Sequence, residues 1–184
     1  MIRPVPQIAC DFVAQHEACR LEAYRDVGGV WTIGYGHTLG VTKGATCSVA
    51  LAKLWLQDDL ATAAKRLAGV VDEAVLLKLT DHQYAALVSF AFNCGTPPKA
   101  TLWKVLNAGQ LERVPTELGR WICAGGKVIP GLVNRRAVEV ALWNTPDDAK
   151  PVPVPPPSSA VTRDAVQPAP QPGLLSRLLG KFAA

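Results

Sequence analysis

The sequence predicts a predominantly helical α+β fold with two lobes, a helical lobe and a smaller lobe built on a β-hairpin. Apolar residues recur mostly at helical spacing before residue 146, and one stretch, 30–36, alternates with a period of two. The composition then changes abruptly, because nine of the fifteen prolines fall between Pro146 and Pro172. We therefore expect a folded domain at 1–146 with segments of another kind after it.

The overall composition is that of a soluble, globular protein. The 184 residues are 49% hydrophobic and 18% charged, which is enough apolar material for a buried core. Pro4 and Pro6, followed by charged residues, stand where a signal peptide would carry its apolar stretch. We expect a monomer made in the cytoplasm, with no signal peptide or transmembrane segment. The net charge of +4 is too modest to indicate a nucleic-acid partner.

The helical elements follow from apolar periodicity and from capping residues. Thr46 and Gly69 are candidates for the start and stop of a long helix, and Thr80 with Gln83 forms a capping box that opens a helix ending near Gly95. The predicted helices span residues 8–17, 47–68, 80–95, 101–108, 115–123 and 131–143.

Between the first two helices the pattern is that of a hairpin. Val30, Thr32 and Gly34 alternate with Trp31 and Ile33, and the segment 26–29 before them has the composition of a turn. The order is therefore helix end, strand, turn and second strand.

Five cysteines are scattered along the chain without the spacing that holds zinc, so we predict no metal and no other cofactor. Free cysteines are usually small core residues, and we expect that here. Cys19 is the exception to watch, because it lies two positions after Glu17.

Two acidic residues and a threonine near this hairpin are candidates for a glycosidase active site. Cleavage of a glycosidic bond needs a proton donor and a second carboxylate across the sugar. Glu17 falls at the negative end of a helix dipole near apolar groups, which would raise its pKa, whereas Asp26 on a solvent-open turn would stay ionised. Thr32 could hold a water beside Asp26. Glu22 competes for the acid role, although a strand position would leave it wetter.

The segment "EACRLEAYRDVGGVWTIGYGHT", residues 17–38, resembles the Glu-eight-Asp-five-Thr triad of the tailed-phage lysozymes, or endolysins, of glycoside hydrolase family 24. The segments "FAFNCG" at 90–95, "TLWKVLNAG" at 101–109 and "RWICAGGKVIPGLVNRRAVEVALW" at 120–143 resemble the endolysin branch of the same family, in the same order. The resemblance therefore covers about residues 7–144.

This resemblance implies Glu17 as general acid, Asp26 as the carboxylate that directs water, and Thr32 as the residue that helps to place that water. It also implies that Arg135 in "GLVNRR" orients Glu17, although the neighbouring Arg136 could do so. His37 resembles a structural histidine of the family and is expected to pair with a buried acid.

The implied activity is inverting hydrolysis of the β-1,4 bond between N-acetylmuramic acid and N-acetylglucosamine in bacterial peptidoglycan, for host cell lysis. Release through a separately encoded pore is expected from the habit of the family. Two alternatives stay open. A lytic transglycosylase would cut the same bond to an anhydro sugar, and a virion-associated component would bind the wall without cutting it.

The segments after the domain differ from each other in composition. Residues 147–172 form a proline-rich linker, and 173–184 place leucines and a phenylalanine opposite Arg177 and Lys181, the pattern of a short cationic amphipathic helix. Either the tail is a disordered, solubilising extension, or 173–184 binds an anionic membrane or lipopolysaccharide surface.

Overall fold

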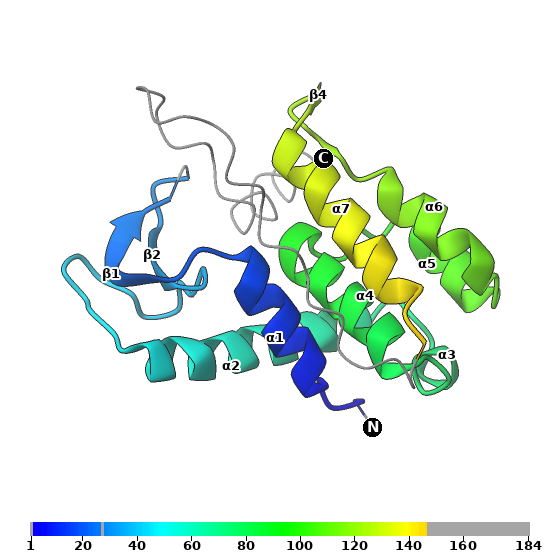
Figure 1. The fold of residues 1–184 in the computed structure, drawn as a ribbon, viewed down its shortest axis with the longest axis horizontal. Coiled ribbons are helices and arrows are strands. Elements are labelled where there is room, and N and C mark those ends of the chain that lie inside the picture. The colour runs from blue at the N-terminus through cyan, green and yellow to red at the C-terminus, as the bar shows by residue number, and fades with distance from the viewer. Residues whose placement is uncertain (1, 27, 147–184) are drawn as a thin grey trace.

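The computed structural model describes residues 2–26 and 28–146. A β-hairpin lies at one end of the molecule, a group of helices lies at the other, and one long helix runs between them (Figure 1). The predicted linker at 147–172 and the predicted tail at 173–184 lie outside the described residues. None of the helices in the described part of the chain is long and apolar enough to cross a membrane.

The N-terminal helix leads directly into the hairpin. Helix α1 spans Gln7–His16 and is followed by strands β1, Arg20–Arg25, and β2, Trp31–Gly34. The strands are antiparallel, and Tyr24 pairs with Thr32. Asp26 closes the turn with a backbone hydrogen bond from its N–H to the Val30 carbonyl, at 2.9 Å. The predicted order of helix, strand, turn and strand is therefore confirmed.

Helix α2, Val49–Leu67, connects the hairpin with the rest of the molecule. Its N-cap is Ser48, whose hydroxyl accepts a hydrogen bond from the Leu51 N–H at 3.1 Å. The predicted cap, Thr46, is wrong, because Thr46 forms a β-bridge with Glu22 and so belongs to the edge of the hairpin. At Gly34 the strand lies close to α2, since an added Cβ would stand 3.1 Å from the Ala52 side chain.

The central helix of the fold is α4, Asp81–Cys94, which packs against α1, α2 and the last helix, α7, Pro130–Trp143. Its predicted capping box is present, with the Thr80 hydroxyl on the Gln83 N–H and the Gln83 side chain on the Thr80 N–H. Nearly every residue of α4 is buried, which makes it the helix around which the others assemble. A one-turn helix, α3, Glu73–Leu76, precedes it and was not predicted.

The C-terminal half contains a second hairpin that the sequence pattern did not reveal. Helix α5 spans Thr101–Asn107, a 3-10 turn η1 spans Leu111–Arg113, and α6 spans Val114–Gly119. The helix predicted at 115–123 is therefore too long. Strands β3, Cys123–Ala124, and β4, Lys127–Val128, follow it and turn through Gly125 and Gly126, both in the left-handed region.

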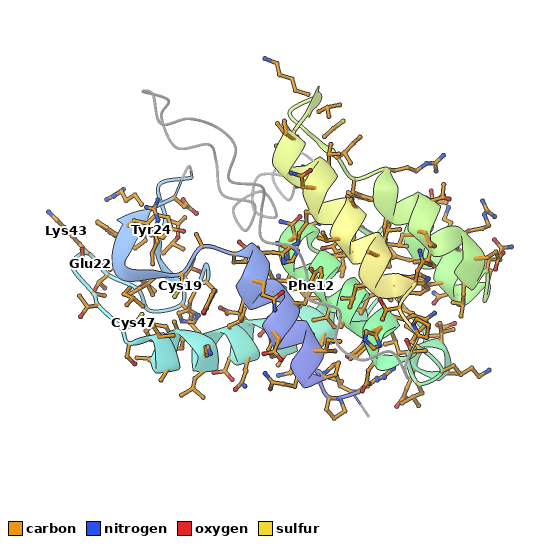
Figure 2. The ribbon with its side chains drawn as sticks, viewed as in Figure 1. Phe12, Cys19, Glu22, Tyr24, Lys43 and Cys47 are labelled. Atoms are coloured by element: carbon orange, nitrogen blue, oxygen red, sulfur yellow. The ribbon has the colours of Figure 1, made fainter. Side chains whose placement is uncertain are left out.

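The cysteine prediction is only partly confirmed. Cys94 is buried in the core cluster, and Cys10 and Cys47 are half-buried against it. Cys123 is exposed, contrary to the expectation, because it lies in the short surface hairpin. Cys19 is exposed between α1 and β1 (Figure 2).

Candidate active site

Glu17 is the residue that ends α1. Its backbone N–H donates to the Val13 carbonyl at 3.0 Å as the helix C-cap. The whole residue is only 8% exposed, and its Oε1 accepts a hydrogen bond from Arg135 Nη1 at 2.7 Å. Of the two arginines that the sequence left open, Arg135 makes this contact. A buried guanidinium favours the ionised carboxylate, so the site is not the simple apolar environment that the sequence suggested.

Asp26 is held by the hairpin turn rather than left open to solvent. Its side-chain Oδ1 accepts a hydrogen bond from the Val30 N–H at 2.7 Å, and the residue is 9% exposed. The expectation of a solvent-open turn is wrong, because the Val30 N–H is brought onto the carboxylate and the residue is buried. Gly28 is needed for this close approach, since an added Cβ would stand 3.2 Å from Oδ1.

Thr32 lies on β2, and its side chain is held by Val30, the residue that also binds Asp26. Its hydroxyl donates to the Val30 carbonyl at 3.1 Å, and the residue is 1% exposed. The Val30 backbone therefore holds the Asp26 carboxylate through its N–H and the Thr32 hydroxyl through its carbonyl. With its proton committed in this way, the hydroxyl oxygen can still accept a hydrogen bond.

Tyr24 connects the two candidate acids electrostatically. Burial raises the pKa of its phenol; the charge of Arg20 opposes that rise, and the negative charges of Glu17 and Asp26 add to it. Both carboxylates are thus near enough to act on one half-buried tyrosine, whose partner across the hairpin is Thr32.

A buried ionic network, which the sequence analysis missed, surrounds Arg135. Glu139 on α7 is fully buried, and its Oε1 accepts hydrogen bonds from Arg135 Nε at 3.1 Å and from Ser89 at 2.7 Å. Arg135 Nη2 also donates to the Ser89 hydroxyl at 3.0 Å. The available signal was the spacing in "RRAVE", which places Glu139 one helical turn after two arginines on an otherwise apolar helix.

The charge state of Arg135 follows from these contacts. Burial by itself would lower the pKa of its guanidinium, but ion pairing with Glu17 and Glu139 raises that pKa above its ordinary value. The same positive charge, together with burial as the larger cause, lowers the pKa of His16.

His37 lies away from this network and holds the hairpin to α2. Its Nδ1 pairs with Asp59 Oδ2 at 2.9 Å, its Nε2 contacts the Leu39 carbonyl oxygen at 3.1 Å, and its ring stacks on Trp55. Asp59 is half-buried rather than buried. In this position the His37 ring joins the hairpin lobe to α2.

Glu22, the rival for the acid role, lies on β1 next to the loop that precedes α2. It is exposed and forms a β-bridge with Thr46. Figure 2 shows it near Lys43, in the loop before α2, and away from α1, which ends at Glu17. No group of three or more His, Cys, Asp or Glu side chains in the described part of the chain could hold a metal ion.

Comparison with known proteins places the chain among phage enzymes. The phage lysozyme family model matches residues 14–139. A SAR-endolysin of Escherichia phage Mu is 39% identical over 66% of this chain and 70% of its own length. An endolysin of Acyrthosiphon pisum secondary endosymbiont phage 1 is 33% identical over 72% of this chain and 92% of its own length.

Solved structures agree with these relatives. The muramidase domain of SpmX from Asticaccaulis excentricus superposes with a TM-score of 0.69 at 28% identity, covering 78% of this chain and 100% of that domain. An endolysin from Escherichia coli O157:H7 phage FAHEc1 gives a TM-score of 0.67 at 26% identity, over 77% and 94% of the two chains. The chain therefore belongs to the phage lysozyme family, and the family, the fold class and the lytic function predicted from its sequence are confirmed.

Proposed function

We propose that this chain hydrolyses the β-1,4 bond between N-acetylmuramic acid and N-acetylglucosamine in peptidoglycan, with Glu17 as general acid, Asp26 as general base and Thr32 as a water-holding residue. The observation that carries the proposal is a pair of buried carboxylates, Glu17 held by Arg135 and Asp26 held by the Val30 N–H, in a member of the phage lysozyme family.

In the first half of the reaction, Glu17 gives its proton to the glycosidic oxygen as the bond to the anomeric carbon breaks. Burial of Glu17 favours the protonated carboxyl group that this role needs, whereas the paired Arg135 guanidinium favours the ionised one, so two opposing influences meet at this residue. The Arg135 guanidinium fixes the direction of the carboxyl group through Oε1.

In the second half, Asp26 accepts a proton from the water that attacks the anomeric carbon. The Val30 N–H engages Oδ1 of Asp26, so Oδ2 remains able to accept from that water. The Thr32 oxygen can accept a hydrogen bond from the other O–H of that water, which stays on the hydroxyl group that bonds to the anomeric carbon, because the Thr32 hydroxyl proton is donated to the Val30 carbonyl. An inverting reaction requires the two carboxyl groups to stand about 6.5–9.5 Å apart, and we expect that separation here.

The test is the chemistry of the products released from purified peptidoglycan. Hydrolysis by this mechanism releases reducing ends whose first-formed anomer, observed by NMR early in the digest, is inverted. Anhydro ends in the mass spectrum would instead identify a lytic transglycosylase. Sedimentation with the wall and no release of ends would identify a wall-binding component, and either outcome would overturn the proposal.

Two finer expectations about partners belong to the same proposal. We expect a monomer, which sedimentation equilibrium tests directly. We also expect residues 173–184 to bind an anionic membrane or lipopolysaccharide surface. Deleting 147–184 should then weaken binding to anionic vesicles and leave digestion of isolated walls intact; undiminished vesicle binding would exclude the membrane role.

We propose finally that the protein is made in the host cytoplasm and reaches the wall through a separately encoded pore. The names of the endolysin relatives fit action at the cell wall, and passage through a pore is our own expectation. Expression of the chain alone in a bacterial host should leave the cells intact until a pore-forming protein is supplied, and lysis by the chain alone would contradict it.

A further inference from the structure

Besides Glu17 and Asp26, the carboxylate of Glu139 is buried, and it pairs with the Arg135 guanidinium that also binds Glu17. Arg135 donates through Nη1 to Glu17 at 2.7 Å and through Nε to Glu139 at 3.1 Å. Both carboxylates are buried, and Glu139 is fully so. In a poorly hydrated site, each of them depends on the guanidinium for charge compensation.

Glu139 has a second cation of its own. Arg136 Nη2 donates to Glu139 Oε1 at 3.1 Å, and Arg136 Nε lies 2.9 Å from Glu139 Oε2 as an ion pair without a hydrogen bond. The four side chains Glu17, Arg135, Glu139 and Arg136 thus form a chain of alternating charge. Arg136 is further anchored on α4 by Asn93 Oδ1 at 2.9 Å.

This arrangement answers a difficulty in the proposed function. A general acid must hold a proton, yet a guanidinium paired only with Glu17 would favour the ionised carboxylate. Sharing the guanidinium with a second carboxylate weakens its effect on the first. We propose that Glu139 is a positioning residue that weakens the electrostatic effect of Arg135 on Glu17. Arg136, which also pairs with Glu139, determines the size of this weakening. The inference rests on the proposed role of Glu17.

The other titratable groups that interact with the four members of this cluster come from α1, β1 and α4. None of them is substituted in the variants below, although Arg136→Gln removes the hydrogen bond from Arg136 Nη1 to Cys94 Sγ, at 3.1 Å. These groups are His16 on α1, Tyr24 on β1 and Cys94 on α4, each of which interacts electrostatically with at least one member of the cluster.

Two single substitutions should shift the alkaline limb of the pH–rate profile in opposite directions. Glu139→Gln keeps the shape of the side chain and removes its charge, so Arg135 pairs with Glu17 alone. The alkaline limb of the pH–rate profile, which reports the acid, should move to lower pH by about one unit. Arg136→Gln leaves the carboxylates of Glu17 and Glu139 with the Arg135 guanidinium as their shared cation. Arg135 then stabilises the ionised form of Glu17 less, so the alkaline limb should move to higher pH.

Two further variants separate this role from a merely structural one. The double variant Arg136→Gln with Glu139→Gln removes one charge of each sign and should return the limb close to its wild-type position. Thr80→Ala removes the cap of α4, the helix that carries Ser89, without changing any charge. It should lower stability and leave the limb in place.

A readout independent of activity keeps the inference separate from the proposed function. The midpoint of the Glu17 carboxyl titration can be followed by carbon-13 NMR and assigned by the loss of the signal in Glu17→Gln. It should fall in Glu139→Gln and rise in Arg136→Gln, even if Glu17 proves not to be the acid. A midpoint that stays within about 0.2 units in both variants, or moves in one direction in both, would overturn the inference.

Discussion

The two candidate carboxylates are held by opposite strategies. Asp26 is bound by the backbone of Val30, four positions away. Glu17 is bound by Arg135, which lies 118 positions away on the last helix and is itself held by Glu139 and Ser89. One site is therefore set by the local geometry of a turn, and the other by a charge network that exists only when α1, α4 and α7 have packed together.

The difference shows which changes each side should tolerate. A turn that carries its own hydrogen bonds can be altered in one side chain with little cost to the fold. A buried network cannot lose one member in the same way, because the charge left behind has no water to solvate it. Substitutions on the hairpin side should thus affect activity alone, whereas those on the helical side should affect activity and stability together.

The largest expected effect is on the hairpin side. Asp26→Asn keeps the hydrogen bond to the Val30 N–H but removes the base, so the release of reducing ends should fall by about 10³–10⁴-fold. The midpoint of urea unfolding should hardly change. Activity within tenfold of the wild type would mean that Asp26 does not activate the water.

On the helical side, Arg135→Gln should cost about 3 kcal/mol of unfolding free energy, because it leaves the buried carboxylates of Glu17 and Glu139 without this cation. Urea denaturation measures the loss, with Arg66→Gln on α2 as the control, since that side chain is exposed. Equal stability of the two variants would remove the distinction between the two sides.

A finer test of the local strategy is Gly28→Ala. The added Cβ would stand 3.2 Å from Asp26 Oδ1, so the carboxylate must shift by a few tenths of an ångström. We expect activity to fall by about tenfold with little change in stability. Gly119→Ala on α6, where an added Cβ meets nothing within 4 Å, is the matched control and should retain full activity.

The smallest expected effect is a pH dependence at the helical side. Burial, followed by the charge of Arg135, lowers the pKa of His16 below its ordinary value of 6.5. The unfolded chain therefore takes up this proton at a higher pH than the folded protein does, and stability should fall as the pH drops below about 6.5. His16→Phe keeps the stacking on Phe12 and should lose less stability than the wild type between pH 7.5 and 5.5; an equal loss would show that His16 does not contribute.

The sequence predicted the hairpin side better than the helical side. The hairpin and its turn are encoded by period-two alternation and by glycines within a few residues, and the Thr80 capping box is a local signal of the same kind. Asp26 and Thr32 could therefore be placed beside one another. The hydrogen bond from the Val30 N–H to Asp26 could not be predicted, because composition indicates a polar turn but does not show which way its amide groups point.

The network around Glu17 was only partly predictable for a physical reason. Resemblance pointed to Arg135, but nothing in the spacing of Ser89 or Glu139 reveals that α4 and α7 bring them to one point. A polar residue on an apolar helix face can be solvated, paired or functional, and only tertiary packing decides among these. The second hairpin at 123–128 was missed because two-residue strands carry no periodicity.

The central claim, that Glu17 supplies the proton, is tested most directly by digesting purified peptidoglycan with the wild type, Glu17→Gln and Glu22→Gln. Circular dichroism should first show that all three are folded. The account predicts that Glu17→Gln releases reducing ends at least about a hundredfold more slowly than the wild type, while Glu22→Gln stays within about twofold. Loss of cleavage in Glu22→Gln with retention in Glu17→Gln would contradict it.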